Sequence, residues 1–114
     1  MGMKEFPNSI DAEEAVVGAV LLKGNDIFTK CDGWIRDPEA FYNNNTKAIW
    51  EACSEMHRNG EAIDVITVSQ YLKDKEVITK DSGLSMYYIT GLSDKVPTTA
   101  NVEHYARIIW EKYI

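Results

Sequence analysis

A run without any polar side chain, Ala15 to Leu22, constrains this chain more than any other stretch. The run is too short to cross a membrane, which takes roughly 20 apolar residues. It is apolar all round, whereas a helix on a protein surface shows a single apolar stripe. We therefore predict a central helix from about Asn8 to Leu22, surrounded by the rest of the domain. Gly18 in its interior costs about 1 kcal/mol relative to Ala, so we expect a second helix to cross close to the backbone there.

Polar residues mark the start of this helix. Asn8 or Ser9 can cap the free backbone N–H groups of the first turn. Asp11, Glu13 and Glu14 then place negative charge beside the positive end of the helix dipole. The same three carboxylates could in principle form a general acid/base group. Their place in the first turn favours the interpretation as charges that stabilise the helix start.

Apolar spacing and capping signals predict further helices along the chain. We expect a short helix over 27–35, a helical turn over 40–42 started by Asp37-Pro38-Glu39, and longer helices over about 45–58, from Asp64 to about 75, from Asp81-Ser82-Gly83 to 92, and from Thr98 or Thr99 to the end of the sequence. Gly60 is expected in the left-handed conformation that ends many helices. No stretch alternates as a half-buried strand does, so the predicted fold is all-α, a compact bundle of about six helices around a buried first helix.

The acidic composition limits the partners of the domain. The chain has 114 residues, the size of one small domain, and a net charge of −6 with a pI of about 4.8. This charge argues against binding to a nucleic-acid backbone, which requires clustered Lys and Arg. No signal peptide is recognisable, and Cys31 and Cys53 lack the spacing of a zinc site or a disulfide framework. We expect buried free thiols and a cytoplasmic location, without contact with a membrane.

Sequence motifs for catalysis or cofactor binding are missing from the chain. It contains no phosphate-binding loop, no dinucleotide-binding glycine motif and no nucleophile elbow. His57 and His104 lack the partner four residues away that a helical zinc pair needs. Trp34, Trp50 and Trp110 lack the neighbouring Lys and Arg typical of base-stacking surfaces. We predict no catalytic, cofactor-binding or metal site in this chain.

The last expected helix carries more apolar residues than one core-facing stripe needs. Five residues share one side at the helical period: Val102, Tyr105, Ala106, Ile109 and Tyr113. Ile108, Trp110 and Ile114 lie off that side and are the candidate residues of a protein interface with another subunit or a partner. The alternative is that these three residues fold back onto the domain itself.

The order and spacing of these landmarks resemble the N-terminal domain of DnaB-type replicative DNA helicases. The matching residues run from Pro7 to Glu111: Pro7-x-Ser9-x-x-Ala12-Glu13, Val17-Gly18, Phe41-Tyr42, Ile49-Trp50, Ala52, Gly60, Ile63-Asp64, Thr67-Val68, Leu72, Pro97-Thr98, Asn101, Tyr105-Ala106 and Ile109. Three positions depart from the family pattern: Thr46 replaces a usual histidine, Glu76 a usual glycine, and Gly83 a Gly-Gly pair. On this resemblance residues 1–6 are a tag or a disordered N-terminus, and residues 7–114 form the DnaB-like domain.

The resemblance implies that the parent protein is a hexameric, ATP-dependent helicase in DNA replication. The motor domain, with ATP and Mg, would follow Ile114, after a missing helical hairpin that the last helix leads into. The present domain would then be a collar that binds other helicase subunits, primase and a helicase loader, without touching nucleic acid. The fragment alone would be a monomer or a weak dimer. The alternative function is a free-standing interaction or regulatory protein that shares the fold, of the primase helicase-interaction-domain type.

Overall fold

The computed structural model of the chain describes residues 9–96 and 98–114. Over these residues the chain forms six α-helices and one 3₁₀ turn, without a strand: α1 (Ile10–Lys23), α2 (Asn25–Asp32), η1 (Pro38–Ala40), α3 (Asn44–Arg58), α4 (Val65–Asp74), α5 (Met86–Lys95) and α6 (Val102–Tyr113). The prediction of an all-α bundle is confirmed. The expected tag at residues 1–6 and the possible cap Asn8 lie outside the described residues.

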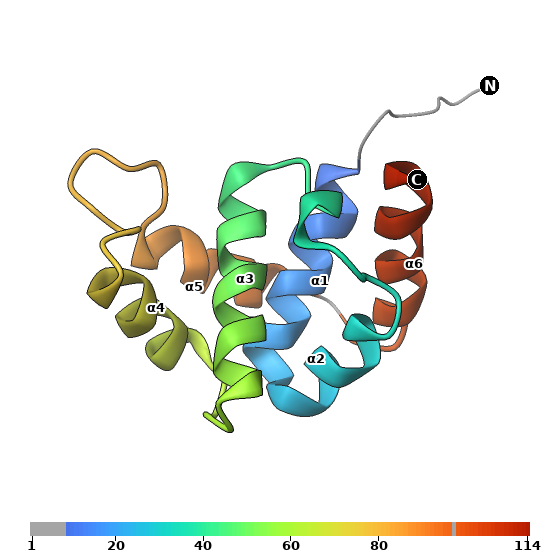
Figure 1. Cartoon of the computed structure of the whole chain (residues 1–114), viewed down its shortest axis with the longest axis horizontal. Coiled ribbons are helices and arrows are strands. Elements are labelled where there is room, and N and C mark those ends of the chain that lie inside the picture. Colours follow the sequence, from blue (N-terminus) through green and yellow to red (C-terminus); the bar gives the residue numbers. More distant parts are fainter. Residues whose placement is uncertain (1–8, 97) are drawn as a thin grey trace.

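Helix α1 is the centre of the bundle, as its apolar run predicts. It contacts α2, α3, α4, α5 and α6, and in Figure 1 it runs between α3 and α6. Val16, Val17 and Val20 are fully buried. At the two ends of the run, Ala15 is half-buried and Leu22 is 51% exposed. No helix within the described residues is long and apolar enough to span a bilayer.

The glycine inside α1 marks a close helix crossing, which confirms the expectation from the sequence. A Cβ atom built on Gly18 would lie 2.4 Å from the carbonyl oxygen of Leu92 and 2.7 Å from a methyl carbon of Val96. Real Cβ atoms do not approach backbone oxygens so closely, so any side chain at this position would push α5 away. Because Gly18 has no side chain, the backbone of α1 can lie directly against the backbone of α5 at Leu92.

Aromatic side chains pack together where α2, the residue after η1 and α3 meet, and two thiols are buried in the same core. The ring centroid of Trp50 lies 4.7 Å from that of Phe28 and 5.3 Å from that of Phe41, distances typical of favourable aromatic pairs. Cys31 and Cys53 are free and buried, as predicted. Burial raises the pKa of each thiol to about 12, with the charge of nearby carboxylates adding to the effect at Cys31.

Several helix boundaries differ from the predictions for local reasons. Helix α2 covers Asn25–Asp32 rather than 27–35, and the 3₁₀ turn covers Pro38–Ala40 rather than 40–42. Helix α5 does not begin at Asp81-Ser82-Gly83 but at Met86, because Ser85 provides the cap and accepts the N–H of Tyr88 at 3.1 Å. The hydroxyl of Ser82 is instead used within its own turn, where it donates to the carbonyl of Leu84 at 3.0 Å.

The start of α6 also differs from the prediction, whereas other caps are confirmed. Asn101 rather than Thr98 or Thr99 precedes α6, and the hydroxyl of Thr98 accepts the N–H of Ala100 in the preceding turn. The expected cap at Asp64 is present as a reciprocal capping box with Thr67. Gly60 has the expected positive φ of 74° after α3.

Candidate protein-interaction surface

Two of the three candidate interface residues, Ile108 and Trp110, lie in the second half of α6, and the third, Ile114, directly follows the helix. Ile108 and Trp110 are half-buried and pack against the core. Ile114 is 78% exposed, and Tyr113, whose ring lies 5.5 Å from that of Trp110, is 45% exposed. Tyr113 and Ile114 are thus the exposed apolar side chains where α6 ends. Only Ile114 of the three offers a largely exposed apolar side chain.

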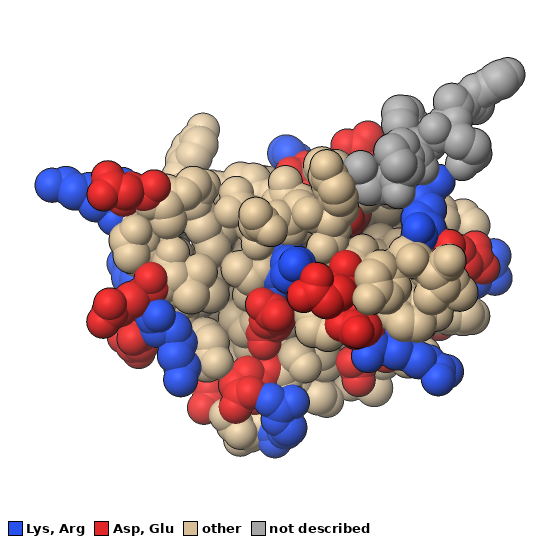
Figure 2. Space-filling view, turned by 45° about the horizontal axis from the view of Figure 1, so that its top comes forward, with Lys and Arg blue, Asp and Glu red and all other residues tan. Residues whose placement is uncertain are grey.

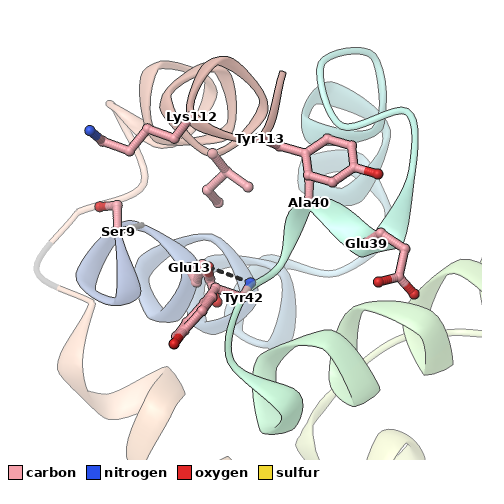
Figure 3. A pocket seen from close by; sticks show the side chains of 8 residues that line it. Ser9, Glu13, Glu39, Ala40, Tyr42, Lys112 and Tyr113 are labelled. Atoms are coloured by element: carbon pink, nitrogen blue, oxygen red, sulfur yellow. Dashed lines mark hydrogen bonds between the residues drawn. The ribbon is translucent and has the colours of Figure 1, made fainter. Parts of the chain in front are cut away.

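A hollow of about 160 Å³ lies beside this end of α6 (Figure 3). Three segments far apart in the sequence line it: Ser9 and Glu13 of α1, the segment with Glu39, Ala40 and Tyr42, and Ile109, Lys112 and Tyr113 of α6. In Figure 3 the ring of Tyr113 lies over Ala40, and the amine of Lys112 points away from the hollow. The hollow was missed at the level of the sequence, because no local pattern shows that these three segments meet.

Glu13 closes the inner side of this hollow with a buried carboxylate. Its side chain is 1% exposed. One oxygen accepts the backbone N–H of Tyr42 at 2.8 Å, and the other accepts the N–H of Asn43 at 3.1 Å and the hydroxyl of Thr46 at 2.7 Å. The interpretation of Glu13 as a helix-start charge is therefore incomplete, because the carboxylate also ties α1 to the start of α3. Each of its oxygens is occupied by a donor, so Glu13 is placed to hold the fold together.

Glu14 ties the start of α1 to α5. One oxygen of its carboxylate accepts the phenol hydroxyl of Tyr88 at 3.1 Å, and the other pairs with the ammonium of Lys95 at 3.2 Å. Burial, followed by the negative charge of Glu14, raises the pKa of Tyr88 to about 12. Next to Tyr88 the first residues of α5 are open to solvent, since Tyr87 is 90% exposed and Met86 42%. Tyr42, before α3, is also largely exposed, at 67%.

Titratable side chains of the described residues do not gather into a metal site. No group of three or more His, Cys, Asp or Glu residues is arranged to hold an ion in this part of the chain. The Nδ1 atom of His57 lies 3.1 Å from the amide nitrogen of Asn25, and the centroid of its ring lies 4.9 Å from that of Phe28, with the two planes tilted by 45°. The face in Figure 2 shows acidic and basic side chains intermixed over a largely uncharged surface. No continuous stripe of basic side chains is seen on this face.

Comparison with known proteins gives a consistent result over almost the whole chain. Residues 5–111 match the family model described as the DnaB-like helicase N terminal domain. The chain is 40% identical over 108 residues to the replicative DNA helicase DnaB of Geobacillus stearothermophilus, covering 95% of this chain and 23% of that protein. It is 34% identical over 108 residues to the replicative DNA helicase DnaC of Bacillus subtilis, with the same coverage of 95% and 23%.

The fold is also similar to a solved structure. The crystal structure of the N-terminal domain of DnaB helicase from Mycobacterium tuberculosis superposes with a TM-score of 0.83 at 29% sequence identity. The match covers 96% of this chain and 76% of that chain. The present chain thus spans the fold of such a domain, and it spans 23% of the length of the two curated relatives.

Proposed function

Since this chain belongs to the DnaB-like helicase N-terminal domain family, we propose that it is the collar or scaffold domain of a hexameric replicative DNA helicase. In this role it mediates subunit assembly and binds primase and a helicase loader during DNA replication in the cytoplasm. Catalysis, with ATP and Mg, belongs to a motor domain elsewhere in the longer protein, and the collar itself binds no cofactor. The observation that carries the proposal is the match of residues 5–111 to the family model, together with the shared six-helix fold.

The end of α6 supports a role in binding proteins. Ile114 and Tyr113 expose apolar surface there, beside the hollow that α1 and the segment before α3 complete. Exposed apolar residues next to a hollow are typical of protein contacts, in which a few side chains carry most of the binding energy. We propose Ile108, Trp110 and Ile114 as the residues that contact a neighbouring subunit or primase.

The gene provides the first test of this proposal. An open reading frame that continues past Ile114 into a phosphate-binding loop supports the helicase collar. A stop codon directly after Ile114 contradicts it and favours the free-standing interaction or regulatory protein. Hydrolysis of ATP by the purified chain would contradict the assignment of catalysis to another domain.

The assembly state provides the second test. We expect the purified chain to be a monomer or a weak dimer in light scattering, because the remaining subunit contacts are supplied by the longer protein. A tight hexamer of this chain at micromolar concentration would contradict this expectation. In the longer protein, Ile114→Asp should weaken hexamer assembly or primase binding, whereas Thr29→Asp on the exposed side of α2 should leave both unchanged. Equal behaviour of the two variants would remove Ile114 from the interface.

A further inference from the structure

A groove runs between α3 and α4, on a part of the molecule that α6 does not contact. It consists of two adjoining hollows of about 520 and 530 Å³, which share Tyr71 and Lys75 as lining residues. In Figure 1 the two helices diverge from their short connection. The residues that line the two hollows come from these two helices and from the segments next to them.

Apolar residues form part of the groove lining: Ala48, Ala52 and Met56 of α3, Leu72 of α4, and Val77 after it. Ala52, Met56 and Leu72 are almost fully buried, whereas Ala48 is half-buried. Val77 is 38% exposed, so apolar surface remains in contact with solvent. This shape leaves room for the side chains of a partner to reach the bottom of the groove.

Tyr71 stands half-buried between the two hollows. The ammonium of Lys75 lies 5.5 Å from the centre of its ring, on the solvent side of the groove. A half-buried tyrosine offers a large, rigid contact area with a polar tip, and such residues are over-represented among those that dominate binding energy. Tyr71 is therefore the expected anchor of a complex formed here.

Charges around the groove are predominantly negative. The lining includes four carboxylates and two cationic side chains: Glu51, Glu55, Glu61 and Asp74 against Arg58 and Lys75. Arg58 is already paired with Glu55. Glu51 lines the first hollow and Glu61 the second. Neither carboxylate forms an ion pair among the described residues. Both are therefore available to a positively charged partner.

We propose that this groove binds an amphipathic helix of another protein, with its apolar face against Tyr71 and Val77 and with Lys or Arg along its edges. An apolar groove between two helices is the surface that accepts such a helix, whose anchors recur at positions i, i+3, i+4 and i+7. The excess of carboxylates selects a basic partner and disfavours an acidic one. The groove is a second docking surface, independent of the end of α6 and of whether the chain is part of a helicase.

A pair of designed peptides tests the charge preference. Both are fluorescent helical peptides of about 14 residues, with Leu at the four anchor positions and either Lys or Glu at every flanking position. We expect the Lys peptide to bind the whole chain at least about tenfold more tightly than the Glu peptide in fluorescence anisotropy, at about 0.1 M salt. No binding of the Lys peptide, or equal binding of both, would overturn the proposal.

Charge variants then locate the binding site. Glu51→Lys combined with Glu61→Lys should weaken binding of the Lys peptide about tenfold or more. The matched control, Asp11→Lys combined with Glu111→Lys, changes the net charge equally at exposed sites on α1 and α6. The control should bind almost as the unmodified chain does. If both double variants lose the same affinity for the Lys peptide, the peptide is attracted only by the overall negative charge of the chain, and the proposal is overturned.

Filling the groove tests the apolar contact. Ala48→Phe places an aromatic ring in the groove and should reduce binding of the Lys peptide about tenfold. The control Thr29→Phe, at an exposed position of α2, should not reduce it. Circular dichroism melting identifies a variant that has lost its fold, in which case the surface charge variants decide alone. Unchanged binding by a folded Ala48→Phe chain would overturn the proposal.

Discussion

The hydroxyl of Thr46 donates a hydrogen bond of 2.7 Å to the buried carboxylate of Glu13, across 33 positions of sequence. The same carboxylate accepts the backbone N–H groups of Tyr42 and Asn43. These two N–H groups precede α3 and therefore do not donate hydrogen bonds within that helix. Glu13 thus satisfies one buried and two partly buried donors, which would otherwise lose hydrogen bonds to water without a replacement. It joins the central helix to the helix that carries Trp50.

Replacing this carboxylate by an amide should destabilise the chain. In Glu13→Gln an NH₂ group must face one of the three donors, which leaves that donor unsatisfied. We expect a loss of about 2–3 kcal/mol in the free energy of unfolding, measured by urea denaturation. Glu14→Gln is the matched control, since Glu14 pairs with a largely exposed Lys95, and should cost about 1 kcal/mol or less. Equal losses in the two variants would contradict the role of Glu13.

Substitution by alanine at two helical glycines should change the stability of the chain in opposite directions. Gly91→Ala in α5 places its Cβ where nothing lies within 4 Å, and we expect stabilisation by about 0.5–1 kcal/mol from helix propensity. Gly18→Ala drives a methyl group against the carbonyl of Leu92 and should destabilise the chain by about 1–3 kcal/mol. Thermal melting of the two variants checks both signs. A stabilised Gly18→Ala chain would show that α1 and α5 are not in close contact.

The ionisation of Tyr88 should make the fold sensitive to alkaline pH. Its pKa is raised from 10.0 to about 12 by burial and by Glu14, so the folded state favours the neutral phenol. The stabilisation that this shift represents is fully present below pH 10 and is lost as the pH rises towards 12. The step in tyrosinate absorbance that Tyr88→Phe abolishes should lie near pH 12, and Glu14→Gln should move it to lower pH. If the step that Tyr88→Phe abolishes lies near pH 10 instead, this assignment is contradicted.

The two cysteines should be inert while the chain is folded. Both thiols are buried and have pKa values raised to about 12, so little thiolate is present at neutral pH. We expect iodoacetamide to leave both unmodified in the native chain and to modify both in denaturant, as measured by mass spectrometry. Modification at the same rate in both conditions would show that Cys31 and Cys53 are not in the core.

Local signals in the sequence predicted those features that depend on neighbouring residues. The Asp64 cap and the left-handed Gly60 are set within a few positions of each residue, and both are present. The start of α5 was misplaced because Ser82 and Ser85 are both capable caps. Which of them is used depends on the carbonyl of Leu84, which binds the Ser82 hydroxyl.

Features that depend on distant segments could not be obtained in the same way. The buried role of Glu13 requires the backbone of Tyr42, 29 positions away, and a carboxylate in a first helical turn has the same local pattern whether it is buried or exposed. The groove beside Tyr71 likewise requires the angle between α3 and α4. Gly18 is an exception among these distant contacts. An interior glycine lowers the stability of a helix, and this cost indicated that another segment packs closely there. It did not identify that segment as α5.

Trp110 separates the two interpretations of the last helix. It is half-buried against the core, whereas Trp50 is 2% exposed. We expect Trp110→Ala to lower the free energy of unfolding by about 1–2 kcal/mol, and Trp50→Ala to lower it by about 3–5 kcal/mol, because a truncated core aromatic loses its full burial and leaves a cavity. In the longer protein, Trp110→Ala should also weaken subunit assembly or primase binding. If Trp110→Ala lowers the free energy of unfolding as much as Trp50→Ala and leaves assembly unchanged, Trp110 belongs to the core of this domain. Ile114 and Tyr113 then remain as the exposed apolar residues at the end of α6.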